Sequence, residues 1–375
     1  MATSTIRGQL RTFPRRAALF AAGALAACSG APGPSTDATS GWTQVTPPEM
    51  AGVTLSDVTA AGAGFEAVGT ALGAGNAQRG QAFKSADGTR WIAAPDETFS
   101  ASTLGVVAAV REGLVALGAG GCSLECGGFQ SWLSSDGTNW SEPTKSARTD
   151  VARPTGLVEQ GSTIVAVATE LLDPSVNRNR GRVYLSMDAK TWVDALTEDA
   201  LAQDSPAGIA TDGASLAAVG STIAEDGTRN GGAWRSTDGH TWSATTDDGS
   251  FSGAQLMAVV HGAGGYLAVG AIRADGAVWA SVDGAAWTRV DGGAFKGSPL
   301  ADIAANGTGY VAVGRGASGG LAWTSTDGKS WRSAGTIPGA EGMKFVAVAI
   351  GPAASIIVGT AAGSPAGKVW LGPLP

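Results

Sequence analysis

One motif repeats an aspartate, a residue type that could do chemistry, six times along this chain. Each copy has the form Ser-x-Asp-Gly-x-x-Trp, with Ala in place of Gly in the third copy. Aspartates can act as general acids or as calcium ligands, but six equivalent residues spaced 44 to 52 positions apart do not form one site. We interpret them as structural turn residues whose carboxylates accept backbone N–H bonds. They are Asp87, Asp136, Asp188, Asp238, Asp283 and Asp327.

Residues that could hold a metal ion are scarce. The 375 residues include only two His, His240 and His261, and three Cys. These numbers exclude a three-histidine site and a four-cysteine zinc site, and we predict neither a metal nor a cofactor. The 32 acidic residues outnumber the 25 Lys and Arg, which argues against a nucleic-acid partner because phosphate binding needs a basic surface.

The N-terminal 27 residues have the features of an export signal. Four arginines precede an apolar run from Ala17 to Ala27, which is too short for a permanent membrane helix. The run ends in Leu25-Ala26-Ala27-Cys28, which resembles a bacterial lipobox. The resemblance implies cleavage after residue 27, lipid on Cys28, and an exported domain anchored to the bacterial cell membrane outside the cytoplasm. Residues 28–40 are small and polar and read as a flexible tether.

Two further cysteines, Cys122 and Cys126, lie in a glycine-rich segment. Outside the cytoplasm a local disulfide between them is the favoured interpretation. Such a bridge closes a short loop, so it would stiffen the loop rather than contribute much stability. A metal site and a redox pair remain the alternatives.

Two other patterns recur with the Ser-x-Asp-Gly motif. A small apolar segment, usually ending in Ala-Val-Gly, occurs seven times, and an aromatic residue two positions before the serine marks a strand between the two patterns. Repeats of this length are typical of propeller blades. We therefore predict an all-β fold, a seven-bladed β-propeller of four-stranded antiparallel blades. Small residues should crowd near the axis, and indoles should fill the widening gaps between the outer strands.

The count of repeat units predicts how the ring closes. The last unit ends at Pro375 without a Ser-x-Asp-Gly motif, whereas Trp42-Thr43-Gln44-Val45 resembles the strand that follows such a motif. We predict that residues 41–46 supply the outermost strand of the last blade, so that Trp42 lies close to Trp370. Residues 41–375 then form a single propeller domain, which we expect to be monomeric.

The repeats resemble the Asp-box, or sialidase-type (BNR), β-propeller superfamily over residues 41–375. The superfamily motif is usually Ser-x-Asp-x-Gly-x-x-Trp, so the motif here is one residue shorter. The resemblance implies that the aspartate turns are structural and lie on the face opposite a ligand site. A sialidase would also need an Arg-Ile-Pro motif and a Tyr nucleophile paired with Glu. The sequence has no Arg-Ile-Pro, and its three tyrosines, Tyr184, Tyr266 and Tyr310, all fit strand positions.

Arginines gather in the segments that join the second and third strands of five blades. Because these segments should lie on one face, they suggest a rim that binds an anion such as a sugar acid, a phosphate or a carboxylate. The alternative is that these arginines are solvated and paired with nearby acids such as Asp226 and Asp275. The candidate ligand residues are Arg79, Arg180, Arg229, Arg273 and Arg315.

Acidic residues near the expected axis are few and scattered, namely Asp57, Glu66 and Asp302. An enzyme of this fold should bring carboxylates together in the central funnel. We therefore expect a non-catalytic binding or assembly scaffold for a protein or glycan ligand in the cell envelope. The alternative is an exported glycoside hydrolase of the sialidase type, or a lyase, acting on the loop rim.

Overall fold

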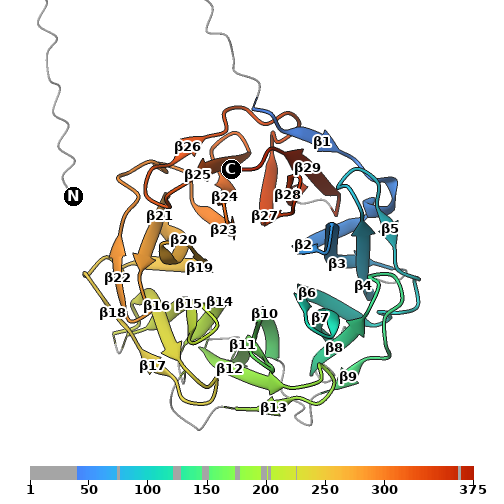
Figure 1. The fold of residues 1–375 in the computed structure, drawn as a ribbon, viewed down its shortest axis with the longest axis horizontal. Coiled ribbons are helices and arrows are strands. Elements are labelled where there is room, and N and C mark those ends of the chain that lie inside the picture. Colours follow the sequence, from blue (N-terminus) through green and yellow to red (C-terminus); the bar gives the residue numbers. More distant parts are fainter. Residues whose placement is uncertain are drawn as a thin grey trace, which may run out of the picture. The chain divides into compact units, whose positions relative to one another are not determined.

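Seven β-sheets surround a central axis in the computed structural model of this chain (Figure 1). The structure describes residues 40–73, 77–120, 128–145, 152–173, 178–195, 201, 204–224, 226–361 and 365–375. Six of the sheets have four strands and the seventh has five. The predicted seven-bladed propeller of four-stranded antiparallel blades is confirmed. We number the blades 1 to 7 in chain order from Val53.

In blades 1 to 6, the strand nearest the axis comes first in the sequence of the blade. Blade 7 differs because its outermost strand, β1, comes from the start of the chain. The innermost strands are β2 (Val53–Ala61), β6 (Ser102–Val110), β10 (Ala152–Gln160), β14 (Ser205–Thr211), β19 (Ala254–Gly262), β23 (Leu300–Asn306) and β27 (Met343–Ile350). The second strands are β3 (Gly64–Leu72), β7 (Gly113–Gly120), β11 (Thr163–Asp173), β15 (Leu216–Ile223), β20 (Gly265–Ile272), β24 (Gly309–Arg315) and β28 (Ser355–Ala361).

The third and fourth strands complete the blades. The third strands are β4 (Gln78–Ser85), β8 (Phe129–Ser134), β12 (Arg178–Ser186), β16 (Arg229–Ser236), β21 (Asp275–Ser281), β25 (Gly320–Ser325) and β29 (Gly367–Gly372). The outermost strands are β5 (Ile92–Ala93), β9 (Thr144–Lys145), β13 (Val193–Asp194), β17 (Ser243–Ala244), β22 (Ala286–Arg289), β26 (Arg332–Ser333) and, in blade 7, β1 (Thr43–Val45). A short 3-10 helix, η1 (Pro48–Met50), follows β1.

The small Ala-Val-Gly segments form the second strands and not the strands at the axis, which corrects the expectation from sequence. In blade 1, six consecutive residues from Gly64 to Gly69 are buried on β3, whereas burial on β2 is interrupted. A second strand is covered on both faces by neighbouring blades, while an innermost strand has one edge at the channel. The need for small residues is therefore greatest one strand away from the axis.

The ring closes as predicted. Strand β1 pairs antiparallel with β29, with Gln44 opposite Trp370, so the first and last described strands lie side by side (Figure 1). Trp42 is 3% exposed and packs in a cluster with Trp370 and Phe345. Burying an indole removes roughly 150–250 Å² from water, so this tryptophan is a large part of what holds the ring shut.

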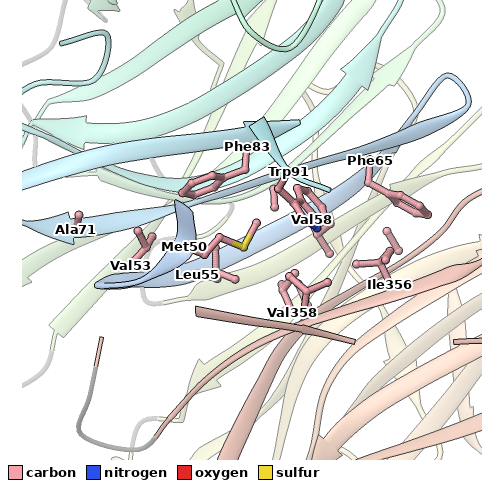
Figure 2. Packing of buried hydrophobic residues seen from close by; sticks show 14 residues of the cluster. Met50, Val53, Leu55, Val58, Phe65, Ala71, Phe83, Trp91, Ile356 and Val358 are labelled. Carbon is pink, nitrogen blue, oxygen red and sulfur yellow. The ribbon is translucent and has the colours of Figure 1, made fainter. Parts of the chain in front are cut away.

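Hydrophobic side chains fill each seam between neighbouring blades. At the seam of blades 7 and 1, Ile356 and Val358 pack with Leu55, Val58 and Phe65 (Figure 2). All of these side chains are at most 5% exposed. The seams are the core of the molecule, because a single sheet cannot bury both of its own faces.

Blade 5 has an additional strand on its outer edge. Strand β18 (Thr246–Asp247) comes from the connection between blades 4 and 5 and pairs in parallel with β22. Since β22 is the longest of the outermost strands, β18 covers the edge that would otherwise be the most open to pairing with another chain. Within the described ranges, no helix has the length and apolar character needed to cross a bilayer.

Candidate functional site

The two faces of the propeller carry different turns. The hairpins between first and second strands and the Ser-x-Asp-Gly turns between third and fourth strands lie on one face, which we call the turn face. The connections between second and third strands lie on the opposite face, which we call the rim face. The five candidate arginines each lie beside one of these connections, so the topology places them all on the rim face.

A polar hollow opens on the rim face over blades 3, 4 and 5. Its volume is about 650 Å³, and its walls come from the rim ends of all three blades. Hydroxyl and amide groups dominate the lining, and several of them are tied together: Asn179 donates to Ser205 at 3.2 Å across the seam of blades 3 and 4. The polar side chains of the lining are Thr155, Thr169, Asn179, Ser205, Ser221, Arg229 and Gln255.

Arg229 is the cation of this hollow. It lies at the start of β16 and is half-buried. Its Nη1 donates to the Ser221 hydroxyl at 2.7 Å, and no carboxylate among the described residues pairs with it. A guanidinium without a counter-ion in a polar hollow is suited to bind an anionic group.

The other candidate arginines are not in the hollow. Arg79 forms an ion pair with Asp96 at 3.0 Å, in a connection between blades 1 and 2. Arg273 lies in the β20–β21 turn with a φ of 59° and, like Arg315, is exposed. Arg180 is half-buried, and its Nε has no hydrogen-bond partner among the described residues. The structure thus brings only Arg229 of the five into the hollow.

Seven β-bulges line the central channel, one in each innermost strand. The bulge in β2, for example, falls between Leu55 and Asp57 and places Ser56 on the channel wall. The channel has a volume of about 240 Å³ and shares Thr155, Ala207 and Met257 with the hollow. The hollow therefore lies at the rim-face mouth of the channel.

Two acidic side chains, Asp57 of blade 1 and Asp302 of blade 6, line the same channel. This corrects the expectation that the acids near the axis are scattered, although Glu66 does lie elsewhere, at a seam. Each aspartate also ties its blade to the next one, since Asp57 accepts from the Val107 N–H at 2.9 Å and Asp302 from the Val348 N–H at 2.8 Å.

Both channel carboxyls have unusual acidity. Withdrawal from bulk water inside the channel raises the pKa of Asp57 to about 7, against the lowering effect of its two backbone N–H donors. The same withdrawal, together with the negative charge of Asp57, raises the pKa of Asp302 to about 8. At neutral pH the pair therefore holds protons that ordinary aspartates release.

The Ser-x-Asp-Gly aspartates are engaged within their own turns. In the second turn, Asp136 accepts from the backbone N–H groups of Thr138 and Asn139 at 2.8 and 2.7 Å. Comparable bonds lower the pKa of Asp87 to about 2, and those at Asp188, Asp327 and Asp238 act in the same direction. Ala189 has a positive φ of 57°, in the left-handed region where glycine lies in the other copies, with φ from 72° to 79°. In the described segments, no group of three or more metal-ligating side chains gathers.

The tyrosines are not available as nucleophiles on a surface. Tyr184, Tyr266 and Tyr310 are at most 4% exposed. The Tyr266 hydroxyl donates to the Ser215 carbonyl at 2.9 Å and accepts from the Asp212 N–H at 3.0 Å, which joins blades 4 and 5. These residues have structural roles.

Cys28, Cys122 and Cys126 lie outside the described residues. Their expected lipidation and disulfide stay predictions. Sequence reasoning did not select the uncharged residues of the hollow, such as Asn179, Ser205 and Gln255. Their only signal was a polar residue at the rim end of a strand, which many other positions share.

Comparisons with known proteins show the fold. No protein-family profile and no curated protein matches the sequence. A structure of YCF48 bound to D1 peptide matches with a TM-score of 0.60 and 14% identity, over 89% of this chain and 97% of that one. A mutant puromycin hydrolase complexed with PGG matches with a TM-score of 0.54 and 11% identity, over 82% and 50%. A Trypanosoma rangeli sialidase in complex with the inhibitor DANA matches with a TM-score of 0.51 and 13% identity, over 71% and 53%. This chain therefore spans about half the length of the hydrolase and of the sialidase, and most of YCF48.

Proposed function

We propose that this protein is a non-catalytic binding or assembly scaffold of the bacterial cell envelope, whose rim face binds a protein or glycan ligand through an anionic group. One observation carries the proposal: the hollow at the channel mouth contains Arg229, and no described carboxylate neutralises it. The likeness to YCF48, whose structure has a bound peptide, supports a binding role for a propeller of this size.

The chemistry of the hollow favours a carboxylate, phosphate or sugar-acid group. The guanidinium of Arg229 can offer parallel N–H donors to two oxygens of one anion. Around it, Asn179, Gln255 and the hydroxyls of Ser205 and Ser221 can bind the neutral polar atoms of a peptide or a sugar. The described residues of the walls include no large aromatic side chain, so polar contacts rather than stacking would select the ligand.

A binding experiment with paired variants tests this function. The protein is immobilised and exposed to envelope protein extract and, separately, to peptidoglycan fragments with free or amidated carboxyl groups. Arg229→Met and the double charge reversal Arg229→Glu with Arg273→Glu should each lower capture by at least tenfold, since a charge-assisted hydrogen bond contributes about 1.5–3 kcal/mol. Arg315→Met, an exposed arginine outside the hollow, is the matched control. Unchanged capture by both Arg229 variants would refute the rim site.

The anchoring of this scaffold is part of the proposal. A lipid on Cys28 and residues 29–40 as a tether would hold the propeller at the membrane, and an acyl chain contributes about 0.8 kcal/mol per buried methylene. Cys28→Ala should abolish incorporation of radiolabelled palmitate and move the protein from the membrane to the soluble fraction. We also propose that Cys122 and Cys126 form a disulfide, which mass mapping of unreduced peptides would detect.

Membership of the Asp-box superfamily is likewise proposed. Its support is the shared turn chemistry, in which the aspartate binds two backbone N–H groups and the indole Nε1 donates to the glycine carbonyl, as Trp91 does to Gly88 at 3.1 Å. Although the motif here is one residue shorter than the usual superfamily motif, its aspartate and its tryptophan still contact the same turn.

A glycoside hydrolase or lyase is the second candidate. It is favoured by the fold likeness to a sialidase and by the carboxyls of Asp57 and Asp302, which line the same channel. Buried tyrosines argue against a sialidase. Incubation with a fluorogenic sialoside should therefore release no fluorophore above the rate of the Asp57→Asn and Asp302→Asn double variant. Turnover that this double variant lacks would favour the enzyme.

A further inference from the structure

Glu66 interrupts an otherwise aliphatic position of the ring. It is the third residue of β3 and is 0% exposed. Glu66 directly precedes the Ala-Val-Gly segment of its blade. In the other six blades the residue directly before the matching segment is aliphatic. Those residues are Val115, Val165, Ala217, Leu267, Val311 and Ile356.

The Glu66 carboxyl lies in the seam between blades 1 and 2 without a hydrogen bond. Both of its oxygens are buried and have no partner among the described residues. They face the Ser-x-Asp-Gly turn of blade 2, where a Cβ added to Gly137 would meet Glu66 Oε2 at 2.5 Å. At the seam of blades 7 and 1, the same contact is made by Ile356 against Gly88. An unpaired carboxyl is thus buried where the fold needs only a hydrocarbon.

Lys84 and Asp136 are the charged groups that face Glu66. Lys84 lies directly opposite Glu66 in the register of β3 and β4, so the two side chains share a face of the sheet. Its ammonium does not bond to Glu66. It reaches across the seam and donates to the Asp136 carbonyl oxygen at 2.5 Å, which ties blade 1 to blade 2.

A cavity of about 460 Å³ adjoins this contact on the turn face. It lies between the β2–β3 and β6–β7 hairpins, and its lining includes Gly62, Gly64 and Gly113. Small residues leave room for Lys84 to turn and for water to enter. The Lys84 ammonium makes a polar contact between the two blades at this cavity, and Phe65, Val110 and Leu114 form the apolar part of its lining.

The acidity of Glu66 matches this environment. Burial raises the pKa of Glu66 to about 8, the Lys84 ammonium opposes the rise, and the Asp136 charge adds to it. The group is neutral at pH 7 and loses its proton in a mildly alkaline medium.

We propose that Glu66 and Lys84 form a proton-controlled latch between blades 1 and 2. When Glu66 gives its proton to a solvent base, the buried carboxylate needs a counter-ion, and the Lys84 ammonium beside it is the nearest one. Lys84 then leaves the Asp136 carbonyl and pairs with Glu66 within blade 1. The proton goes to the solvent, no bond between heavy atoms changes, and the seam opens on the turn face. This latch does not depend on any ligand of the rim face.

Hydrogen exchange of the full-length protein tests the latch. Backbone exchange is measured in peptides covering residues 61–66 and 109–114, at pH 6.5 and pH 9.0, and wild type is compared with Glu66→Gln at each pH so that the intrinsic rate cancels. At pH 9.0 the wild type should exchange several-fold faster than Glu66→Gln, because about nine tenths of a carboxyl is ionised one pH unit above its pKa. At pH 6.5 the difference between the two proteins should be much smaller, because Glu66 then keeps its proton while the seam is closed.

Three further variants make the test decisive. Glu66→Ile restores the residue type of the other blades and should fold and show no pH effect. Lys84→Met removes the hydrogen bond from Lys84 to the Asp136 carbonyl oxygen, and the variant should exchange fast at both pH values. Glu97→Gln, an exposed acid between blades 1 and 2, should behave as wild type. Equal exchange of wild type and Glu66→Gln at pH 9.0, or protection of the seam in Lys84→Met, would overturn the latch.

Discussion

Two ion pairs of this propeller show how strongly the contribution of an ion pair to stability depends on its burial. In blade 3, Arg182 contacts Glu170 at 2.6 Å and Asp194 at 3.1 Å, and the three side chains are 6%, 11% and 12% exposed. The pair of Arg79 with Asp96 is nearly as short, at 3.0 Å, but these side chains are 37% and 69% exposed. Water screens the second pair and not the first.

Replacing Arg182 should therefore destabilise the protein far more than replacing Arg79. Arg182→Leu removes the guanidinium that Glu170 and Asp194 share in this buried cluster and should lower the free energy of unfolding by about 3–5 kcal/mol. Arg79→Leu should change it by about 0–1 kcal/mol. Urea unfolding followed by tryptophan fluorescence measures both. Equal losses would show that the buried group is relieved in some other way, for example by protonation of the acids.

The glycines of the Ser-x-Asp-Gly turns give a graded prediction. An alanine at a left-handed position costs about 1–2 kcal/mol in backbone energy. Gly284→Ala should cost about that much, since the new Cβ would be 3.3 Å from its nearest neighbour. Gly328→Ala should cost about 1–3 kcal/mol more, because the Cβ would lie 2.4 Å from a buried Leu267 methyl. Thermal unfolding of the two variants side by side checks the order.

Among the elements, the short strand β1 contributes the most to closure of the ring for its length. It contributes three residues, yet it closes blade 7 and carries Trp42 into the last seam. The indole Nε1 of Trp42 is buried without a partner among the described residues, so packing and not hydrogen bonding holds it there.

Trp42→Ala should consequently weaken ring closure. The expected loss is about 3–5 kcal/mol of unfolding free energy, as for other buried aromatic truncations. Thr43→Ala, an exposed neighbour on the same strand, should stay within about 0.5 kcal/mol of wild type. Denaturant melts of both variants measure this difference. Similar stability of the two would mean that β1 is dispensable for closure.

At the scale of the whole molecule, the channel aspartates couple stability to pH. Their pKa values, about 7 for Asp57 and about 8 for Asp302, lie above the ordinary value of 3.8. Between pH 3.8 and these values the folded protein holds protons that the unfolded chain releases. The free energy of unfolding must therefore fall as pH rises through this range, and the contribution is fully present only below about pH 4.

The double variant Asp57→Asn with Asp302→Asn should remove much of this dependence. Each asparagine keeps an oxygen that can accept the N–H of the next blade, but it cannot ionise. Urea midpoints measured from pH 5 to pH 9 should fall steeply for wild type and less steeply for the variant. Parallel curves would assign the pH dependence to other groups, of which Glu66 is the first to examine.

The sequence was sufficient to predict the ring because its evidence is repeated. Seven small apolar segments and one unmatched strand around Trp42 fixed the number of blades and the closure. The prediction that the small apolar segments lie at the axis was wrong, because the bulged innermost strands alternate between buried and half-exposed residues and have no motif. The hollow was missed for a related reason. It depends on contacts between blades, such as Asn179 with Ser205, which no repeat within a blade reveals.

Ring closure by a three-residue strand also has a mechanical consequence. The backbone pairing that joins β1 to blade 7 consists of three residue pairs, Thr43 with Leu371, Gln44 with Trp370 and Val45 with Val369. Tension applied through the polypeptide that precedes Trp42 would load these pairs before any blade. Under such a pull, the circle would give way at its own joint while the individual sheets remained intact.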